Sequence, residues 1–447
     1  MNHSVVGAAT QLITSSAARR APLTPDPFVI DGTTRSPAEY AAALSRAAAA
    51  PVAPASVYVH LPFCPSRCLS CDHSSVVTHE PAVIDAYLDS LALEFRLVAE
   101  GLGKRRQVAQ LHVGGGTPNY LSVPQLVRLA TMIDAHFDLT PDAEVSLEAN
   151  PSRATPGQLE LLAGIGFNTI HFELRDLDPA VQRAIGRAHS PAMLKDVFAN
   201  AREAGIRTIG MDLLYGLPGQ TLTSMRNTVT AALALQPDRI ACYPFSRRVE
   251  AFPHQRAIDP SDIPSLADKL ALLDAIATGF EGARFTWVGL DCFVRPGDPL
   301  AIAQSEGRLR RNRIGYTLHE TAELLGFGMA AVSEVDGLLV QNHPDLARWQ
   351  GALASGELPL RAGARLADTR RRQRDAMAHL MSNMTLRDHH SLRGVEALAE
   401  YERNGLVRVT DDGISVTPQG RLVLHHILSD SSPRHRWDGI WQLPMTG

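Results

Sequence analysis

From about residue 57 the chain alternates between short apolar runs and longer stretches whose apolar residues recur at helical spacing. The short runs are rich in β-branched residues and end in polar or glycine-rich turns, a pattern typical of strands that each lead into a helix. Six strands are expected, at Val57 to Leu61, Gln110 to Val113, Glu144 to Glu148, Thr169 to Phe172, Thr208 to Leu213 and Arg239 to Tyr243. Six such units in series predict an α/β fold in which a parallel sheet curls toward a barrel, with its chemistry at the carboxyl ends of the strands.

The composition changes on either side of this region and divides the chain into four expected parts. Residues 1–52 are rich in Ala, Ser, Thr and Pro and are expected to form a flexible arm. The barrel is expected over residues 53–300, and residues 301–364 are expected to cover it. Residues 365–447 predict helix, helix, hairpin and helix, which is a winged-helix-like order.

Charge and hydropathy restrict the partners of the chain. Its 447 residues carry a formal net charge of −4, so no broad basic field suggests nucleic acid, and the basic triplet Arg370 to Arg372 is explained by a solvated helix face. No apolar run approaches the roughly 20 residues that cross a bilayer. The N-terminus also lacks the pattern of a secretory signal. We therefore expect neither nucleic acid nor membrane as a partner, and a cytoplasmic location.

Three of the five cysteines, Cys64, Cys68 and Cys71, form a CxxxCxxC loop directly after the first expected strand. Three thiolates can hold a four-iron, four-sulfur cluster and leave one iron open. That iron can chelate S-adenosylmethionine and pass it an electron. A zinc site completed by His73 or His79 is the alternative.

The other two cysteines, Cys242 and Cys292, are isolated in the sequence. A free cysteine of this kind is usually a small buried hydrophobic residue. We therefore expect neither to bind metal.

Further polar residues stand at the ends of the expected strands. The turn Gly114 to Pro118 lets backbone approach a ligand and leaves N–H groups free for the carboxylate or amino end of a cofactor, although a plain tight turn is the alternative. Glu148 can accept hydrogen bonds from a ribose or an ammonium, or serve a structural role. Asp212 is a charged residue inside an apolar strand, which favours a functional role. Arg175 and Arg187 are possible counter-charges for these carboxylates.

Four stretches together resemble the oxygen-independent coproporphyrinogen III dehydrogenase family of radical S-adenosylmethionine enzymes. They are Val57 to Cys64, Gly114 to Pro118, Ser146 to Pro151 and Asp212 to Pro218, and the resemblance continues into the C-terminal module. It implies a partial (β/α)6 TIM-like radical S-adenosylmethionine barrel with a C-terminal winged-helix-like domain. It also implies a 4Fe-4S cluster on Cys64, Cys68 and Cys71, one S-adenosylmethionine bound to that cluster and a second beside it.

The resemblance also implies a set of cofactor-binding residues. Those that match positions around the cluster-bound S-adenosylmethionine are Tyr58, Gly115, Glu148 and Val332. Those that match positions around the second molecule are Gly116, Thr117, Arg187 and Asp212. The set is completed by Ser70, Arg175 and Ser246.

Some positions depart from the family pattern. His73 stands where the family has a further cysteine, Ser70 where it has an aromatic residue, Arg175 where it has glutamine and Ile314 where it has another glutamine. The tyrosine-rich N-terminal motif of the family also has no counterpart in this chain.

The implied reaction belongs to haem biosynthesis. A radical derived from S-adenosylmethionine takes hydrogen from a propionate of coproporphyrinogen III, and loss of carbon dioxide and an electron leaves a vinyl group. We expect a monomer that receives electrons from a donor such as flavodoxin or ferredoxin. Two alternatives stay open: a methyl transfer or other radical reaction on a different substrate, which His73 favours, and a non-catalytic haem chaperone.

Overall fold

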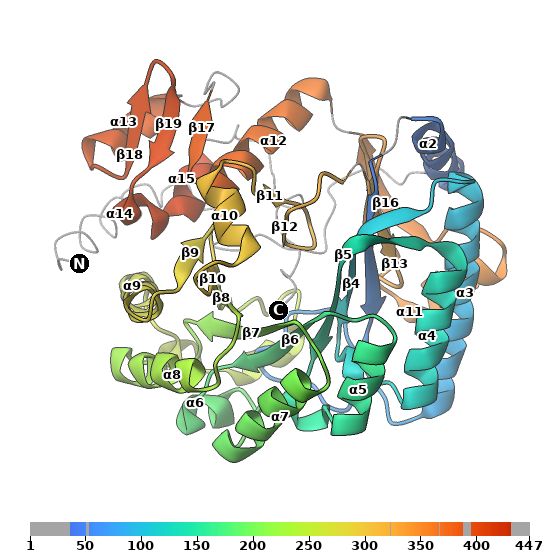
Figure 1. Ribbon diagram of the computed structural model, residues 1–447, viewed down its shortest axis with the longest axis horizontal. Coiled ribbons are helices and arrows are strands. Elements are labelled where there is room, and N and C mark those ends of the chain that lie inside the picture. Colours follow the sequence, from blue (N-terminus) through green and yellow to red (C-terminus); the bar gives the residue numbers. More distant parts are fainter. Residues whose placement is uncertain (1–35, 51–52, 322, 366, 388–394, 431–447) are drawn as a thin grey trace.

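The computed structural model describes residues 36–50, 53–321, 323–365, 367–387 and 395–430 (Figure 1). Its centre is a sheet in which six consecutive neighbours run parallel. These strands are β1 (Ala55–Leu61), β4 (Gln107–Gly115), β5 (Asp138–Ala149), β6 (Thr169–Arg175), β7 (Thr208–Tyr215) and β8 (Arg239–Pro244). The six expected strands and their parallel order are therefore confirmed.

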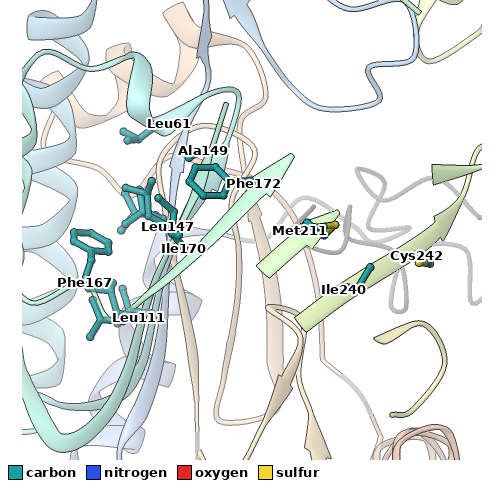
Figure 2. Close-up of a cluster of buried hydrophobic side chains, with 14 of the residues drawn as sticks. Leu61, Leu111, Leu147, Ala149, Phe167, Ile170, Phe172, Met211, Ile240 and Cys242 are labelled. Atoms are coloured by element: carbon teal, nitrogen blue, oxygen red, sulfur yellow. The ribbon is translucent and has the colours of Figure 1, made fainter. Parts of the chain in front are cut away.

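A layer of helices covers the outer face of these strands (Figure 1). The helices are α3 (Pro81–Leu102), α4 (Val123–His136), α5 (Pro156–Gly164), α6 (Pro179–Ala184), α7 (Pro191–Glu203), α8 (Leu222–Ala234) and α9 (Leu266–Gly282). Most of them have a proline in the first two helical positions, where its fixed φ suits the helix and its missing N–H costs no bond. Figure 2 shows Leu111, Leu147 and Ile170, from three neighbouring strands, within the buried apolar layer.

Additional strands extend the sheet at both edges. Beside β1 lies the parallel β13 (Leu324–Phe327), followed by the antiparallel β14 (Val332–Val335), β15 (Leu338–Asn342) and β16 (Leu360–Arg365). These strands fall in the segment expected to cover the barrel, and they share its sheet. Helix α11 (Leu346–Ala354) lies in the same segment. At the other edge β8 pairs with β10 (Cys292–Val294), which pairs with β9 (Thr286–Val288).

The expectation of a flexible arm over residues 1–52 is wrong for helix α2 (Pro37–Ala49), whereas residues 1–35 lie outside the described ranges. Ser36 and Glu39 form a capping box that starts this helix. Tyr40 and Leu44 are buried, and the helix packs on α3, β14 and β15. The alanine-rich composition therefore reflects helix propensity and close packing.

A C-terminal domain follows the sheet. It contains α12 (Asp368–Asn383), β17 (Thr385–Arg387), α13 (Val395–Arg403), β18 (Val407–Thr410), β19 (Gly413–Val416), α14 (Pro418–Arg421) and α15 (Leu424–Asp430). Its three strands form a small antiparallel sheet in the order β17, β19, β18. This arrangement confirms the winged-helix-like fold.

The C-terminal domain is attached to the barrel by hydrogen bonds. Arg421 donates to the backbone carbonyls of Trp287 (2.7 Å) and Gly289 (2.9 Å), and its guanidinium lies over the Trp287 ring. Helix α10 (Pro299–Ser305) also contacts α12.

The amino end of the barrel is bridged by the short pair β11 (Arg310–Arg311) and β12 (Tyr316–Thr317). Between them, the Asn312 amide donates to Ser56 on β1 (3.0 Å) and Gln110 on β4 (2.7 Å). The opposite, carboxyl end of the strands is therefore the one left for a site. None of the helices in the described ranges combines the length and apolar composition that a bilayer crossing requires.

Candidate functional site

A cavity opens at the carboxyl ends of the strands, with about 600 Å³ of empty space when the open solvent at its mouth is included. Backbone and side chains from the loop after β1, the turn after β4, the end of β6 and the segment after α6 surround it. Its lining residues are Cys64, Pro65, Ser66, Arg67, Cys68, Ser70, Cys71, Asp72, His73, Ser75, Gly115, Gly116, Thr117, Asn150, Glu173, Arg175, Arg187 and Leu214. The structure thus brings all three motif cysteines to one cavity, as predicted.

The cysteine loop is fastened at several points. Its ends meet where β2 (Phe63–Cys64) pairs with β3 (Val76–Val77). In the middle of the loop, the Leu69 N–H donates to the Ile185 carbonyl at 3.0 Å. The Cys71 carbonyl is 2.8 Å from His254 Nε2 and accepts from Gln255 Nε2 at 3.1 Å. The loop is therefore held to parts of the barrel far along the sequence.

Each motif thiol is free of a disulfide and has a different surrounding. The Cys64 thiol lies 3.4 Å from the Thr117 hydroxyl, and burial raises its pKa to about 12. Burial also acts to raise the pKa of Cys71, but the adjacent His73 imidazole outweighs burial and lowers it. The Cys68 sulfur accepts a hydrogen bond from Arg187 Nη1 at 3.8 Å.

These three thiols fit a four-iron cluster. In the described residues no three His, Cys, Asp or Glu side chains converge on a single-ion position. A four-iron cube is held at separate corners, so its thiolates remain apart around the space that it fills. Of the two histidines considered for a zinc site, His73 lines the cavity, whereas His79 is exposed and outside it.

The glycine turn after β4 differs from the expectation in one respect. Its N–H groups are not left free, because Gly115 donates to Glu148 (2.9 Å), Gly116 to the Leu61 carbonyl (2.8 Å) and Thr117 to the Phe63 carbonyl (2.9 Å). A Cβ on Gly116 would lie 2.6 Å from the Pro62 backbone. The glycines therefore allow close approach of the turn to the cysteine loop, and its N–H groups fix that approach.

Glu148 lies on β5 behind this turn and does not line the cavity. It is 3.1 Å from His112 Nε2, whose other nitrogen is 2.7 Å from the Ser146 hydroxyl. Burial acts to raise the pKa of Glu148, but the hydrogen bond and charge of His112 prevail and lower it to about 2. Tyr58 stacks on His112, with ring centroids 6.0 Å apart. Tyr58 and Glu148 therefore form a buried polar layer beneath the cavity.

A charged group that sequence reasoning missed is Glu173 on β6. Its two carboxylate oxygens accept separately from Arg175 (2.5 Å) and Arg187 (3.1 Å), and all three side chains are largely buried. Arg175 has the left-handed φ of 69° at a register shift between β6 and β7. Glu173 is a charge inside an apolar strand, the same signal that identified Asp212.

Asp212 lies opposite Glu173 in the register of β6 and β7 and is fully buried. Neither of its carboxylate oxygens has a hydrogen-bond partner in the described residues. Burial raises the pKa of Asp212 well above its usual value, against the attraction of Arg175. An unpartnered buried carboxylate is costly and marks a place where a ligand can complete the bonding.

Of the remaining predicted cofactor residues, one lines the cavity and two do not. Ser70 is buried and lines the cavity. Ser246 follows β8 at the same end of the sheet but does not line the cavity. Val332 does not line the cavity either, and is buried on β14 in a small apolar cluster with Leu339 and Ala362. Cys242 and Cys292 are buried away from the cavity, as expected.

A partial parallel barrel with a three-cysteine loop at its carboxyl end defines the class of radical S-adenosylmethionine enzymes, which use a 4Fe-4S cluster and S-adenosylmethionine. The Radical SAM superfamily profile matches residues 58–232. Within this class, the chain belongs to the oxygen-independent coproporphyrinogen III oxidase family.

Curated relatives and a solved structure carry this assignment. The oxygen-independent coproporphyrinogen III oxidase of Synechocystis sp. is 34% identical over 390 residues, 84% of each chain. That of Escherichia coli is 34% identical over 84% of this chain and 85% of its own. The solved structure of the Escherichia coli protein, HemN, a radical SAM enzyme, has a TM-score of 0.86 and 32% identity, and covers 92% of this chain and 97% of that one. The family, the fold class and the enzymatic nature expected from the sequence are confirmed.

Proposed function

We propose that this chain converts propionate side chains of coproporphyrinogen III to vinyl groups, giving protoporphyrinogen IX for haem synthesis. The observation that carries the proposal is the likeness to coproporphyrinogen III oxidases through both the barrel and the C-terminal domain. In each conversion the substrate loses a hydrogen atom, carbon dioxide and one electron, which passes to an acceptor.

Cys64, Cys68 and Cys71 hold the cluster in this proposal. When bound, the cluster and S-adenosylmethionine supply the carbon-centred radical that removes the hydrogen atom. The described cavity walls contribute hydroxyl groups from Ser70 and Thr117 and the net positive charge of Arg175, Arg187 and Glu173 together. These groups suit the carboxylates of S-adenosylmethionine and of a propionate.

We further propose that Asp212 accepts hydrogen bonds from a second S-adenosylmethionine, through its ammonium or ribose hydroxyls. Its unpartnered carboxylate supports this role. Gly116, Thr117 and Arg187 lie toward the same molecule in this proposal, whereas Tyr58 and Glu148 support the cluster-bound one from below. Ser246 and Val332 complete the two sites.

The physiological setting is likewise a proposal. We propose a cytoplasmic monomer that receives electrons from flavodoxin or ferredoxin and has neither nucleic acid nor membrane as a partner. The acidic net charge supports the exclusion of nucleic acid from this setting.

The test is an anaerobic assay of reconstituted, reduced protein with S-adenosylmethionine and coproporphyrinogen III. Mass spectrometry follows 5′-deoxyadenosine and the tetrapyrrole together, and the Cys68→Ala variant is the control. Deoxyadenosine with loss of two carbon dioxides supports the proposal. Deoxyadenosine with an unchanged tetrapyrrole would instead favour another radical reaction, in keeping with His73, and an intact cluster without any deoxyadenosine would favour a haem carrier.

A further inference from the structure

We propose that Glu173 is a positioning residue that holds the Arg187 guanidinium against the Cys68 sulfur and thereby raises the reduction potential of the cluster. The inference rests on the proposed function, since it requires a cluster on Cys68. It assigns a role to a carboxylate that belongs to none of the predicted cofactor contacts.

The contacts form a chain between three separate elements. Arg187, after α6, donates through Nη2 to Glu173 on β6 at 3.1 Å. Through Nη1 it donates to the Cys68 sulfur, on the loop after β1, at 3.8 Å. The side chains of Glu173 and Arg187 are 3% and 9% exposed, so water competes little for these bonds. One planar guanidinium therefore joins the carboxylate to a cluster ligand.

This series of contacts from Glu173 through Arg187 to Cys68 needs a carboxylate at position 173. The two Glu173 oxygens serve two guanidiniums, one each, with Arg175 bound at 2.5 Å. Asp212 also attracts both arginines, and its oxygens have no hydrogen-bond partner in the described residues. Because a guanidinium is a rigid fork, anchoring one N–H at Glu173 fixes the direction of the other toward Cys68. Without that anchor, the same charge can turn to Asp212.

A donor on a cluster sulfur affects the reduction equilibrium directly. Reduction adds an electron to the cluster, so an N–H donor and a positive charge at a ligand sulfur favour the reduced form. Arg187→Met should therefore lower the reduction equilibrium constant about tenfold, or about 59 mV for one electron. Arg187→Lys, which keeps the charge but loses the fork, should lower it less.

The role of Glu173 is isolated by a double-mutant cycle, since its own negative charge also affects the potential. Glu173→Leu has no acceptor oxygen and so can hold neither arginine. In that background, Arg187→Met should shift the potential much less than in the parent enzyme, because the guanidinium has already left the sulfur. Glu173→Asp, which shortens the reach, gives the same comparison where the Leu variant does not assemble a cluster.

The measurement is a redox titration of the reconstituted holoenzyme without S-adenosylmethionine, followed by electron paramagnetic resonance. Glu144→Gln is the matched control, because Glu144 pairs with the largely buried Arg239 (3.3 Å) at the opposite end of the barrel, and it should not change the potential. An equal Arg187→Met shift in both backgrounds, or no shift at all, would overturn the positioning role while leaving the proposed function intact. Absence of a cluster from the parent protein would overturn both.

Discussion

The two ends of the barrel both bury arginine–carboxylate pairs, yet they differ in what is left unbonded. At the amino end, Arg239 lies between Glu144 (3.3 Å) and Asp298 (3.0 Å), and Asn312 binds Ser56 and Gln110. Every side-chain polar atom of these residues that is fully buried has a partner in the described structure. These residues therefore bond one another, although Nε of the neighbouring Arg311 is buried without a partner in the described residues.

At the carboxyl end, Glu173 holds Arg175 and Arg187, but both oxygens of Asp212 and Nε2 of His73 are buried without a partner in the described residues. Buried polar groups are nearly always bonded, so unpartnered ones require an explanation. The comparison teaches that a buried charge does not by itself indicate function. What distinguishes the carboxyl end is a carboxylate with both oxygens unbonded, Asp212, which lies opposite the cavity-lining Glu173 in the strand register and can be bonded by a ligand.

The largest expected effect is the loss of the cluster. Changing Cys64, Cys68 or Cys71 singly to Ala should abolish the iron and labile sulfide content of the reconstituted protein, because each thiolate holds one corner of the cube. Cys242→Ala and Cys292→Ala are matched controls, since both thiols are buried outside the cavity, and they should retain the full content. Retention of a complete cluster by all three motif variants would contradict the placement of the cluster at the carboxyl end of the barrel.

A large effect on stability is expected at the opposite end. Arg239→Met should lower the free energy of unfolding by about 3 kcal/mol or less, because it leaves the partly buried carboxylates of Glu144 and Asp298 without their counter-charge. Chemical denaturation measures the loss, and cluster content should be unaffected in the folded fraction. A variant as stable as the parent would show that the amino end is not closed by this pair.

Sequence patterns predicted the barrel and the cysteine loop because both are local signals. Strand periodicity is carried by neighbouring residues, and the three cysteines span eight positions. The contact between Cys68 and Arg187 joins residues 119 apart, so no local pattern contains it. The bonding of the glycine N–H groups is also tertiary, since it depends on the backbone of Leu61 and Phe63.

Local sequence patterns signalled two features that the predictions left out, helix α2 and Glu173. Helix α2 is preceded by Ser36 with Glu39 three residues later, which is a capping-box pattern that the alanine-rich composition obscured. Glu173 stands within the apolar strand from Thr169 to Arg175, as Asp212 does in its own strand. The expected strand ended at Phe172, whereas β6 continues to Arg175, so the criterion of a charge within an apolar strand finds Glu173 only once the strand is extended by these residues.

A smaller effect is expected at the turn that joins the glycines to the cysteine loop. Gly116→Ala should cost up to about 3 kcal/mol of stability, because the added Cβ meets the Pro62 backbone at 2.6 Å. Gly157→Ala is the control, since its Cβ enters open space in helix α5. Thermal or urea unfolding compares them, and cluster reconstitution should be impaired in the first variant alone. Equal stability would mean that the turn can move away from the loop.

The smallest expected effect is a change in the free energy of unfolding that has opposite signs at the two ends of the barrel. Asp212→Asn should stabilise the ligand-free protein at neutral pH by on the order of 1 kcal/mol, because it removes a buried carboxyl group that must either keep an unpartnered charge or hold a proton. The raised pKa of Asp212 makes its contribution to stability complete below the unfolded value of about 3.8, and that contribution is lost as pH rises toward the folded value. The advantage of Asp212→Asn should therefore grow with pH.

Asp298→Asn is the counterpart at the amino end and should destabilise, because the carboxylate there is bound to Arg239 at 3.0 Å. Asparagine still caps helix α10 in place of Asp298, so the loss reports the ion pair. Urea titrations between about pH 4 and pH 8 measure both differences, and calorimetry should show weaker S-adenosylmethionine binding for Asp212→Asn alone. If both variants were destabilised alike, Asp212 would already be satisfied within the protein, and the distinction between the two ends would fail.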